Sequence, residues 1–281
     1  MIRNILKISN LNVTFRGASE EFTAVDNFSL EIKKGETIAI VGESGSGKST
    51  TALSILGLLP YPIAHHNKGS IKFKNTELLN ADSKKLQKYR GSKIGMIFQE
   101  PMMSLNPLHT VNKQIQEAIL IHNKTPLNML KKRVSELINL VGLNDSEKYL
   151  YSYPHQLSGG QRQRVMIAIA IANNPDLLIA DEPTTALDVT IQIQILQLLK
   201  KIQRKLGMSI LLITHDLGIV KFMAKNVYIM YKAKLVEFGK VKNVLSAPKN
   251  IYTNFFPINA VSGSSFTLIK SSNYLDKDSI S

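Results

Sequence analysis

The chain has 281 residues and a formal net charge of +14, and 44% of its residues are hydrophobic. This apolar fraction is enough to build a core, which excludes wholesale disorder. The sequence contains no cysteine, which excludes disulfides, thiolate metal sites, iron–sulfur clusters and cysteine nucleophiles. Neither a signal peptide nor the run of about 18 apolar residues needed to span a membrane can be recognised. We therefore expect a mature, soluble globular protein.

The N-terminal part predicts short strands followed by a strand, a glycine-rich loop and a helix. Turn signals at Gly17 and at Lys34-Gly35 separate the β-type runs. Apolar residues then recur at helical spacing until Pro60. We expect strands over residues 5–15, 24–32 and 37–41, and a helix over 48–59.

The rest of the chain predicts a helical insertion followed by a return to alternating strands and helices. We expect strands over residues 69–80, 93–98, 177–180 and 209–214, and helices over 111–122, 127–141, 161–172 and 189–205. A terminal hairpin is expected over 226–238, with its turn at Lys232-Ala233. The pair His65-His66 is expected in a loop. Residues 256–281 are rich in Ser, Asn and Asp, which predicts a flexible tail or a truncated linker.

The segment from Gly42 to Ser49 fits the pattern G-x-x-x-x-G-K-[ST] between an apolar strand and a helix. In this pattern backbone N–H groups at a helix N-terminus bind phosphate oxygens. Lys48 is expected to reach the β- and γ-phosphates of ATP, and the Ser49 hydroxyl to bind Mg²⁺. The predicted phosphate-binding residues are Gly42, Glu43, Ser44, Gly45, Ser46, Gly47, Lys48, Ser49 and Thr50.

Two acidic residues follow a short apolar strand, where open parallel sheets place their ligands. Asp181 suits an outer-shell role toward Mg²⁺. Glu182 has no cationic neighbour in the sequence, and it suits the general base that activates the attacking water.

A second helix start is also suited to phosphate. The residues Ser158, Gly159, Gly160 and Gln161 open a long helix, whose N-terminus carries partial positive charge. This helix end lies across the helical insertion from the phosphate loop. We therefore expect that the two ends do not meet on one nucleotide within one subunit, and that a partner subunit completes the site.

These segments together resemble the ATP-binding cassette (ABC) ATPases over about residues 5–255. The family's motifs occur in order as Phe15, the phosphate loop, Gln99, LSGGQ at 157–161, LLIADE at 177–182, Ala186-Leu187-Asp188 and His215. The resemblance implies an α/β P-loop NTPase fold with a RecA-like parallel-sheet core, an N-terminal antiparallel β subdomain and an inserted α-helical subdomain at about residues 100–170.

The same resemblance implies roles for the remaining motif residues. Phe15 would stack on adenine, Gln99 would sense Mg²⁺ and the lytic water, Asp188 would lie across a dimer interface, and His215 would hydrogen-bond the γ-phosphate. An amide and an imidazole are chemically suited to these tasks.

Three longer stretches are similar to the peptide, dipeptide and nickel importer branch of the family, and most of all to the first cassette of fused microcin C and oligopeptide importer ATPases. They are QEPMMSLNPLHTVNKQI, YSYPHQLSGGQRQRV and ADEPTTALDVTIQIQIL. This similarity implies an ATPase motor at the cytoplasmic face of the inner membrane. Its partners would be an identical or different second cassette, two membrane permeases and, indirectly, a periplasmic substrate-binding protein.

Some positions depart from the branch pattern. Asn250 and Ile251 replace the usual His-Pro before Tyr252, which puts the function of that segment in doubt. Ala233 replaces a usual Gly, at a cost of about 1 kcal/mol if its φ is positive. The cysteine cluster of many relatives is missing.

Two alternatives remain. The chain could be a degenerate half-cassette with little turnover. It could also be a non-transport ABC ATPase acting on nucleic acid, which the basic charge favours. The span from Gln99 to Leu157 is too short for a long coiled-coil arm, so no nucleic acid partner is expected.

Overall fold

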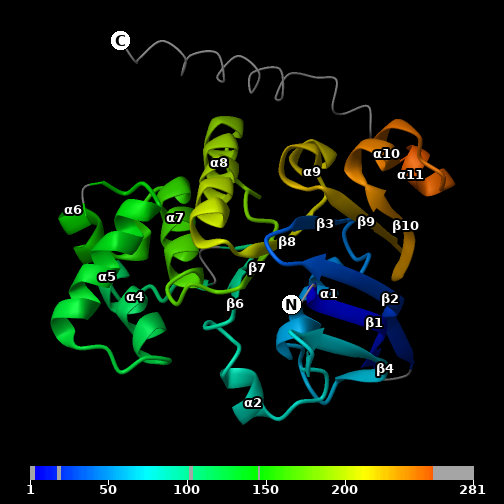
Figure 1. Cartoon of the computed structure of the whole chain (residues 1–281), viewed down its shortest axis with the longest axis horizontal. Helices are drawn as coiled ribbons and strands as arrows, with labels where there is room; N and C mark the ends of the chain where they lie inside the picture. Colours follow the sequence, from blue (N-terminus) through cyan, green and yellow to red (C-terminus); the bar gives the residue numbers. More distant parts are fainter. Residues whose placement is uncertain (1–3, 18–19, 101–103, 145, 256–281) are drawn as a thin grey trace.

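A computed structural model describes residues 4–17, 20–100, 104–144 and 146–255. The strands are β1 (Asn4–Arg16), β2 (Glu21–Lys33), β3 (Thr37–Val41), β4 (Ala64–Phe73), β5 (Thr76–Glu77), β6 (Ile94–Ile97), β7 (Leu177–Asp181), β8 (Ser209–Thr214), β9 (Asn226–Tyr231) and β10 (Lys234–Lys240). They form one sheet in the order β5-β4-β1-β2-β10-β9-β3-β8-β7-β6 (Figure 1).

The helices are α1 (Lys48–Leu56), α2 (Ser83–Gln87), α4 (Val111–Leu120), α5 (Leu127–Leu140), α6 (Ser146–Tyr151), α7 (Gly159–Ala170), α8 (Val189–Leu206), α9 (Leu217–Met223), α10 (Val241–Ser246) and α11 (Ile251–Phe255), with a 3-10 turn, η1, at Pro154–Gln156. The predicted tail, residues 256–281, lies outside the described residues.

The predicted parallel core is confirmed in strands β9, β3, β8, β7 and β6, which pair in parallel with one another in this order. On its other side β9 pairs antiparallel with β10. All residues of β3, β7 and β8 are buried. A strand covered on both faces needs a run of apolar residues, which explains IAIV in β3 and ILLI in β8.

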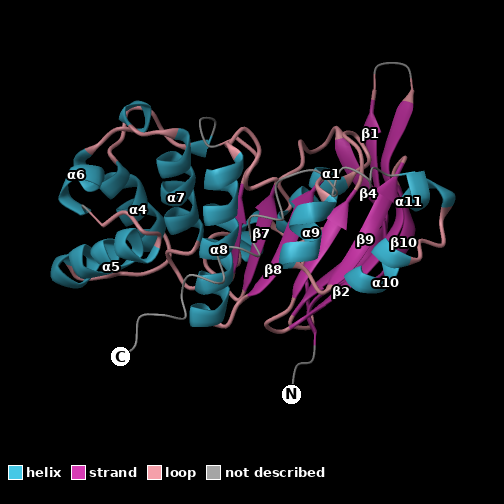
Figure 2. Cartoon of the chain, turned by 90° about the horizontal axis from the view of Figure 1, so that it is seen from above, coloured by secondary structure: helices cyan, strands magenta, loops and turns pink. Residues whose placement is uncertain are grey.

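The two faces of this parallel sheet pack into different cores. Ile38 and Ile40 of β3 join a cluster with α1 and the antiparallel strands, whereas Ala39 and Val41 join a cluster with α7, α8 and α9. Successive residues alternate between the two cores because strand side chains point to opposite faces. Figure 2 shows α4 to α7 on one side of the molecule and the long strands β1, β2 and β4 on the other.

The predicted N-terminal antiparallel unit is formed by β1, β2, β4 and β5. The expectation that His65-His66 lies in a loop is wrong, because β4 already begins at Ala64 and pairs His65 with Thr14 of β1. The AHHNKG sequence has no apolar alternation. Pairing with the long β1 therefore decides its conformation.

The helices α4, α5, α6 and α7 lie within the predicted insertion of about residues 100–170, whose boundaries stay a prediction. Thr110 caps α4 by accepting a hydrogen bond from the Lys113 N–H. The helix expected over residues 48–59 is shorter than predicted. It ends at Leu56 because Gly57, at φ 59°, adopts the left-handed conformation that closes a helix.

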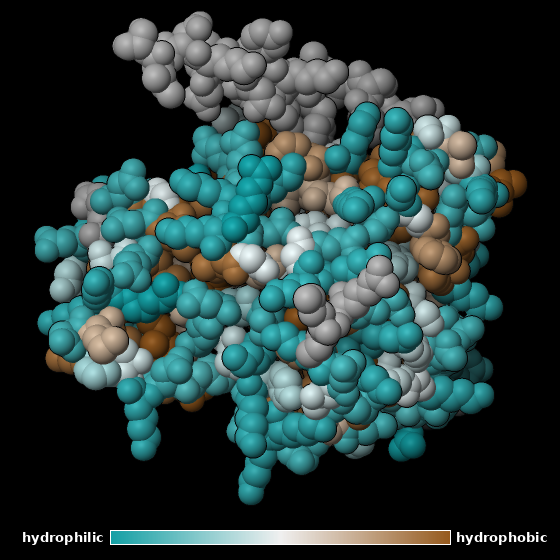
Figure 3. Space-filling view, in the orientation of Figure 1, coloured by the Kyte–Doolittle hydropathy of each residue, from teal (hydrophilic) through white to brown (hydrophobic). Residues whose placement is uncertain are grey.

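The face seen in Figure 3 is mainly hydrophilic. Hydrophobic residues show at several places on it, among them the upper right around α10 and α11. Ile251 and Phe255 of α11 are exposed. Within the part of the chain that the structure describes, no helix is long and apolar enough to cross a membrane.

The turn between β9 and β10 confirms that the Ala233 position requires a positive φ. Lys232 and Ala233 have φ values of 45° and 68°. We expect Ala233→Gly to stabilise the fold by about 1 kcal/mol and to raise the melting temperature by about 2–4 °C. Thermal unfolding followed by circular dichroism measures this. The matched control, Ala118→Gly inside α4, is expected to lower the melting temperature, and an equal fall in Ala233→Gly would contradict the prediction.

Candidate active site

The strand order brings four predicted motifs to the carboxyl edge of the parallel sheet. The phosphate loop follows β3, His215 follows β8, Glu182 follows β7 and Gln99 lies two residues after β6. Parallel strands end at the same edge, and ligands of open α/β sheets bind there. Residues far apart in the sequence therefore come together at one site.

The phosphate loop is seated against the ends of β2 and β9. A Cβ atom on Gly42 would lie 2.2 Å from the Met230 carbonyl oxygen, and one on Gly47 would lie 2.3 Å from the Ala24 carbonyl oxygen. Gly47 also has a φ of 100°, immediately before α1 begins. Only glycine fits such close backbone approaches, so the loop needs glycine at both positions.

Lys48 lies folded over this loop and is 5% exposed. Its Nζ donates hydrogen bonds to the carbonyl oxygens of Gly42 at 2.8 Å and of Glu43 at 2.7 Å. Burial lowers the pKa of Lys48, and the nearby carboxylates of Glu182, Asp181 and Glu43 act in the opposite direction. The ammonium group is thus held beside the loop amides that would receive phosphate.

Asp181 and Ser49 fit the predicted Mg²⁺ site. Asp181 is 5% exposed, and among the described residues its Oδ1 has no hydrogen-bond partner. Burial raises the pKa of Asp181, and a hydrogen bond from Ser49 partly offsets that rise. Carboxylate and hydroxyl oxygens are ligands that Mg²⁺ prefers, and an open carboxylate oxygen beside Ser49 leaves room for the ion's shell.

Glu182 is held by three side chains. Its Oε2 accepts hydrogen bonds from Gln99 Nε2 at 3.2 Å and Thr185 Oγ1 at 2.8 Å, and its Oε1 lies 3.1 Å from His215 Nδ1. Burial raises the pKa of Glu182, but the bonds from Thr185 and His215 and the charges of His215 and Lys48 outweigh it, so the pKa lies below its usual value. The carboxylate is therefore ionised at neutral pH and able to accept a proton.

Thr185 was not among the residues predicted from the sequence. Its signal was available, because it follows Glu182 by three residues in a turn closed by the Thr185 N–H and the Glu182 carbonyl. Glu182 itself has a φ of 45°. This left-handed conformation turns the chain sharply after β7.

The second predicted phosphate-binding helix end, at α7, is capped by its own residues. Ser158 Oγ accepts from the Gln161 N–H at 3.3 Å, and Gln161 Oε1 accepts from the Ser158 N–H at 2.8 Å. A Cβ atom on Gly160 would lie 2.8 Å from Ile191 of α8, whereas Gly159 has more space. Both hydrogen bonds of this cap stay within residues 158–161. That the two helix ends do not meet on one nucleotide within one subunit stays a prediction.

The turn after Glu182 is tied to α7. Gln163, which is 2% exposed, donates from its Nε2 to the Pro183 carbonyl oxygen at 2.5 Å.

Asp188 caps α8 through a hydrogen bond from the Ile191 N–H to its Oδ1, at 3.0 Å. Phe15, near the end of β1, is half-buried against the core that contains α1. Its stacking on adenine and the position of Asp188 across a dimer interface stay predictions.

Comparison with known proteins agrees with this geometry. Residues 25–185 match the ABC transporter family. The chain is 52% identical over 249 residues to the peptidoglycan transport ATP-binding protein YejF of Agrobacterium fabrum, covering 89% of this chain and 46% of that protein. It is 48% identical over 252 residues to the oligopeptide transport ATP-binding protein OppD of Bacillus subtilis, covering 90% of this chain and 70% of that protein.

A solved structure has the same fold. The dimeric post-hydrolysis state of the ATP-binding cassette MJ0796, bound to ADP and Pi, has a TM-score of 0.75 and 33% identity, covering 84% of this chain and 98% of that chain. The predicted ABC cassette fold is thereby confirmed. The chain spans about half the length of the YejF relative. On its motifs, its fold and these relatives, the chain belongs to the ABC transporter family of ATP-binding proteins.

Proposed function

We propose that the chain is the ATP-hydrolysing motor subunit of an importer for peptides or related small molecules. The observation that carries this proposal is the joint placement of Lys48 over the phosphate loop and of an ionised Glu182 at the same sheet edge. Relatives named for oligopeptide and dipeptide transport support the substrate class. They do not favour either a nucleic acid function or a degenerate cassette.

Each site residue has a chemical task in this proposal. The amides of residues 42–50 and the ammonium of Lys48 bind the phosphates of ATP. Ser49 and Asp181 hold Mg²⁺, which supplies charge compensation at the phosphates. Glu182 accepts the proton of the attacking water, and His215 donates a hydrogen bond to the γ-phosphate.

A second cassette is proposed to complete the site. The end of α7 at Ser158–Gly160 would face the γ-phosphate of the other subunit with the N–H groups of Gly159 and Gly160, and Asp188 would lie at the same interface. Gln163 of α7 donates a hydrogen bond to the carbonyl oxygen of Pro183, the residue after Glu182. A movement of α7 when the two cassettes close would therefore also move Glu182. The dimeric state of the MJ0796 cassette supports this arrangement.

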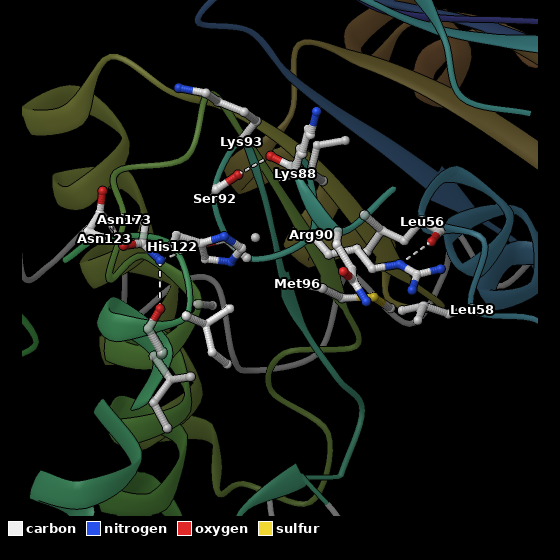
Figure 4. A pocket seen from close by; sticks show the side chains of 18 of the residues that line it. Leu56, Leu58, Lys88, Arg90, Ser92, Lys93, Met96, His122, Asn123 and Asn173 are labelled. Carbon is white, nitrogen blue, oxygen red and sulfur yellow. Dashed lines mark hydrogen bonds between the residues drawn. The ribbon is translucent and has the colours of Figure 1, made fainter. Parts of the chain in front are cut away.

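A groove between the sheet and the helices is proposed as the surface for a membrane permease (Figure 4). Its volume is about 1040 Å³. Arg90 shapes one wall by donating to the carbonyl oxygens of Leu56 and Gly57, both at 2.7 Å. The lining also includes exposed apolar and basic side chains, among them Leu58, Phe98, Ile121, Lys88 and Lys93.

The groove is connected to the catalytic residue by a short path. Phe98 lines it and directly precedes Gln99, whose Nε2 binds Glu182. A partner that moves Phe98 would therefore also move Gln99, whose side chain donates a hydrogen bond to Glu182. Such a partner would place this chain peripherally at the cytoplasmic face of the membrane, with a periplasmic binding protein acting on the other side.

Peptide uptake by cells tests the proposal. A strain that lacks this chain is expected to lose uptake of short peptides, and the unmutated chain is expected to restore it. Ile121→Glu places a charge on a groove side chain that is 76% exposed. We expect it to reduce the restored uptake while ATP hydrolysis by the purified chain stays unchanged. Normal uptake in the deletion strain would exclude the proposed substrate class.

A further inference from the structure

The turn that follows β7 holds the backbone of Glu182 in a fixed conformation. The Glu182 N–H donates a hydrogen bond to the Ile213 carbonyl oxygen of β8 at 2.9 Å. The carbonyl oxygen of the next residue, Pro183, accepts a hydrogen bond from the buried Gln163 of α7. Glu182 has a φ of 45°, and a residue other than glycine keeps this left-handed conformation only where its surroundings impose it. Contacts with both β8 and α7 therefore fix the turn.

Thr185 lies on the same turn and contacts Glu182 twice. Its N–H donates to the Glu182 carbonyl oxygen at 3.2 Å, and its Oγ1 donates to the Glu182 Oε2 at 2.8 Å. A threonine side chain is stiff, because its branched Cβ restricts its one heavy-atom torsion angle. The backbone of the turn therefore decides where the hydroxyl lies, and the hydroxyl in turn binds the carboxylate.

The two oxygens of the Glu182 carboxylate have different partners. Oε1 lies 3.1 Å from His215 Nδ1, whereas Oε2 accepts from Thr185 and, at 3.2 Å, from Gln99 Nε2. In the proposed function His215 donates to the γ-phosphate, and the family resemblance gives Gln99 a task toward Mg²⁺ and the lytic water. Thr185 has no task toward the nucleotide. Its contact with Glu182 can therefore persist when ATP is bound.

We propose that Thr185 is a positioning residue for ATP hydrolysis, whose hydroxyl holds Oε2 of Glu182 so that Oε1 stays directed at the attacking water. The inference rests on the proposed role of Glu182 as the general base. When His215 donates to the γ-phosphate instead, Oε1 becomes free to accept the proton of the water, while Oε2 stays bound to Thr185. A carboxylate that is already oriented loses less freedom on the way to the transition state.

The test measures ATP hydrolysis by the purified whole chain. Thr185→Val keeps the branched shape of the side chain and removes its hydroxyl. We expect kcat to fall about five- to ten-fold with an unchanged KM for ATP. This is less than the full value of a hydrogen bond to a charged group, because Gln99 still donates to the same oxygen. Thr185→Ser keeps a hydroxyl and is expected to retain most of the turnover.

A double variant separates positioning of Glu182 from a merely structural role. In Glu182→Gln the side chain that Thr185 holds can no longer act as a base. Adding Thr185→Val to Glu182→Gln is therefore expected to slow the remaining hydrolysis by less than about two-fold, measured as phosphate release in a single turnover. A structural role would instead lower turnover by the same factor in both backgrounds. Thermal unfolding of every variant checks that it is folded.

Thr125→Val is the matched control, because it removes the same hydroxyl from the loop between α4 and α5. It is expected to hydrolyse ATP like the unmutated chain. A kcat of Thr185→Val equal to that of this control, or an equal loss in the two backgrounds, would overturn the inference and leave the proposed function intact. If the unmutated chain hydrolysed no ATP, the proposed function and the inference would both fail.

Discussion

Glu182→Gln is expected to slow ATP hydrolysis by a factor of about 10²–10⁴, the usual contribution of a general base, while ATP binding is retained. The amide has nearly the same shape as the carboxylate but cannot accept the proton of the attacking water. Its oxygen can still accept from Thr185. Phosphate release at saturating ATP measures the turnover, and calorimetry measures the binding.

Two features of the site make this prediction specific. Glu182 is ionised because Thr185 and His215 stabilise its negative charge against the effect of burial. Gln99 orients the same carboxylate from the neighbouring strand. Glu182→Gln therefore removes a negative charge that Thr185, His215 and Lys48 stabilise. Because the two side chains have nearly the same size, the substitution opens no cavity.

Glu136→Gln is the matched control for this experiment. Glu136 lies on α5, where its side chain is 51% exposed and pairs at 3.7 Å with the half-buried Arg133 three residues earlier. A solvent-exposed carboxylate at this separation contributes little to stability, so turnover is expected to match the unmutated chain. Hydrolysis by Glu182→Gln at the control rate would exclude Glu182 as the general base.

Several candidate site residues could be proposed from the sequence because they follow strand ends. At Gly42 a glycine-rich loop follows an apolar strand, and at Asp181 two carboxylates end one. Such a pattern identifies the strand and also marks the carboxyl end at which a ligand would bind. Gln99 and His215 were placed by resemblance, and the structure brings both to Glu182. Parallel strand order then explains why residues more than 100 positions apart meet.

Other features could not be predicted from local pattern. The conformation of His65 depends on pairing with a strand 50 residues earlier, and the end of α1 depends on the left-handed Gly57 and not on Pro60. The stacking of Tyr252 on Tyr231 joins segments that share no periodicity or motif. These features arise from tertiary packing, which overrides local propensity.

Lys48→Met is the second substitution with a large expected effect. Methionine preserves the aliphatic stem of this buried side chain and removes only its charge and its three donors. In the structure those donors hold the carbonyl oxygens of Gly42 and Glu43. Burial lowers the pKa of Lys48, which means that the buried environment disfavours its charged form. We therefore expect that removing the charge changes the free energy of unfolding little.

The cost is expected in ATP affinity instead. A hydrogen bond to a charged group contributes about 1.5–3 kcal/mol, so losing the contact between Lys48 and the phosphates is expected to weaken ATP binding about 10- to 100-fold. Calorimetric titration of ATP measures this, with thermal unfolding as the check on folding. Lys205→Ala, an exposed position on α8, is the control and is expected to bind ATP normally. A Lys48→Met protein that is folded and binds ATP as tightly as this control would show that the buried ammonium does not serve the phosphates, and the proposed site would have to be abandoned.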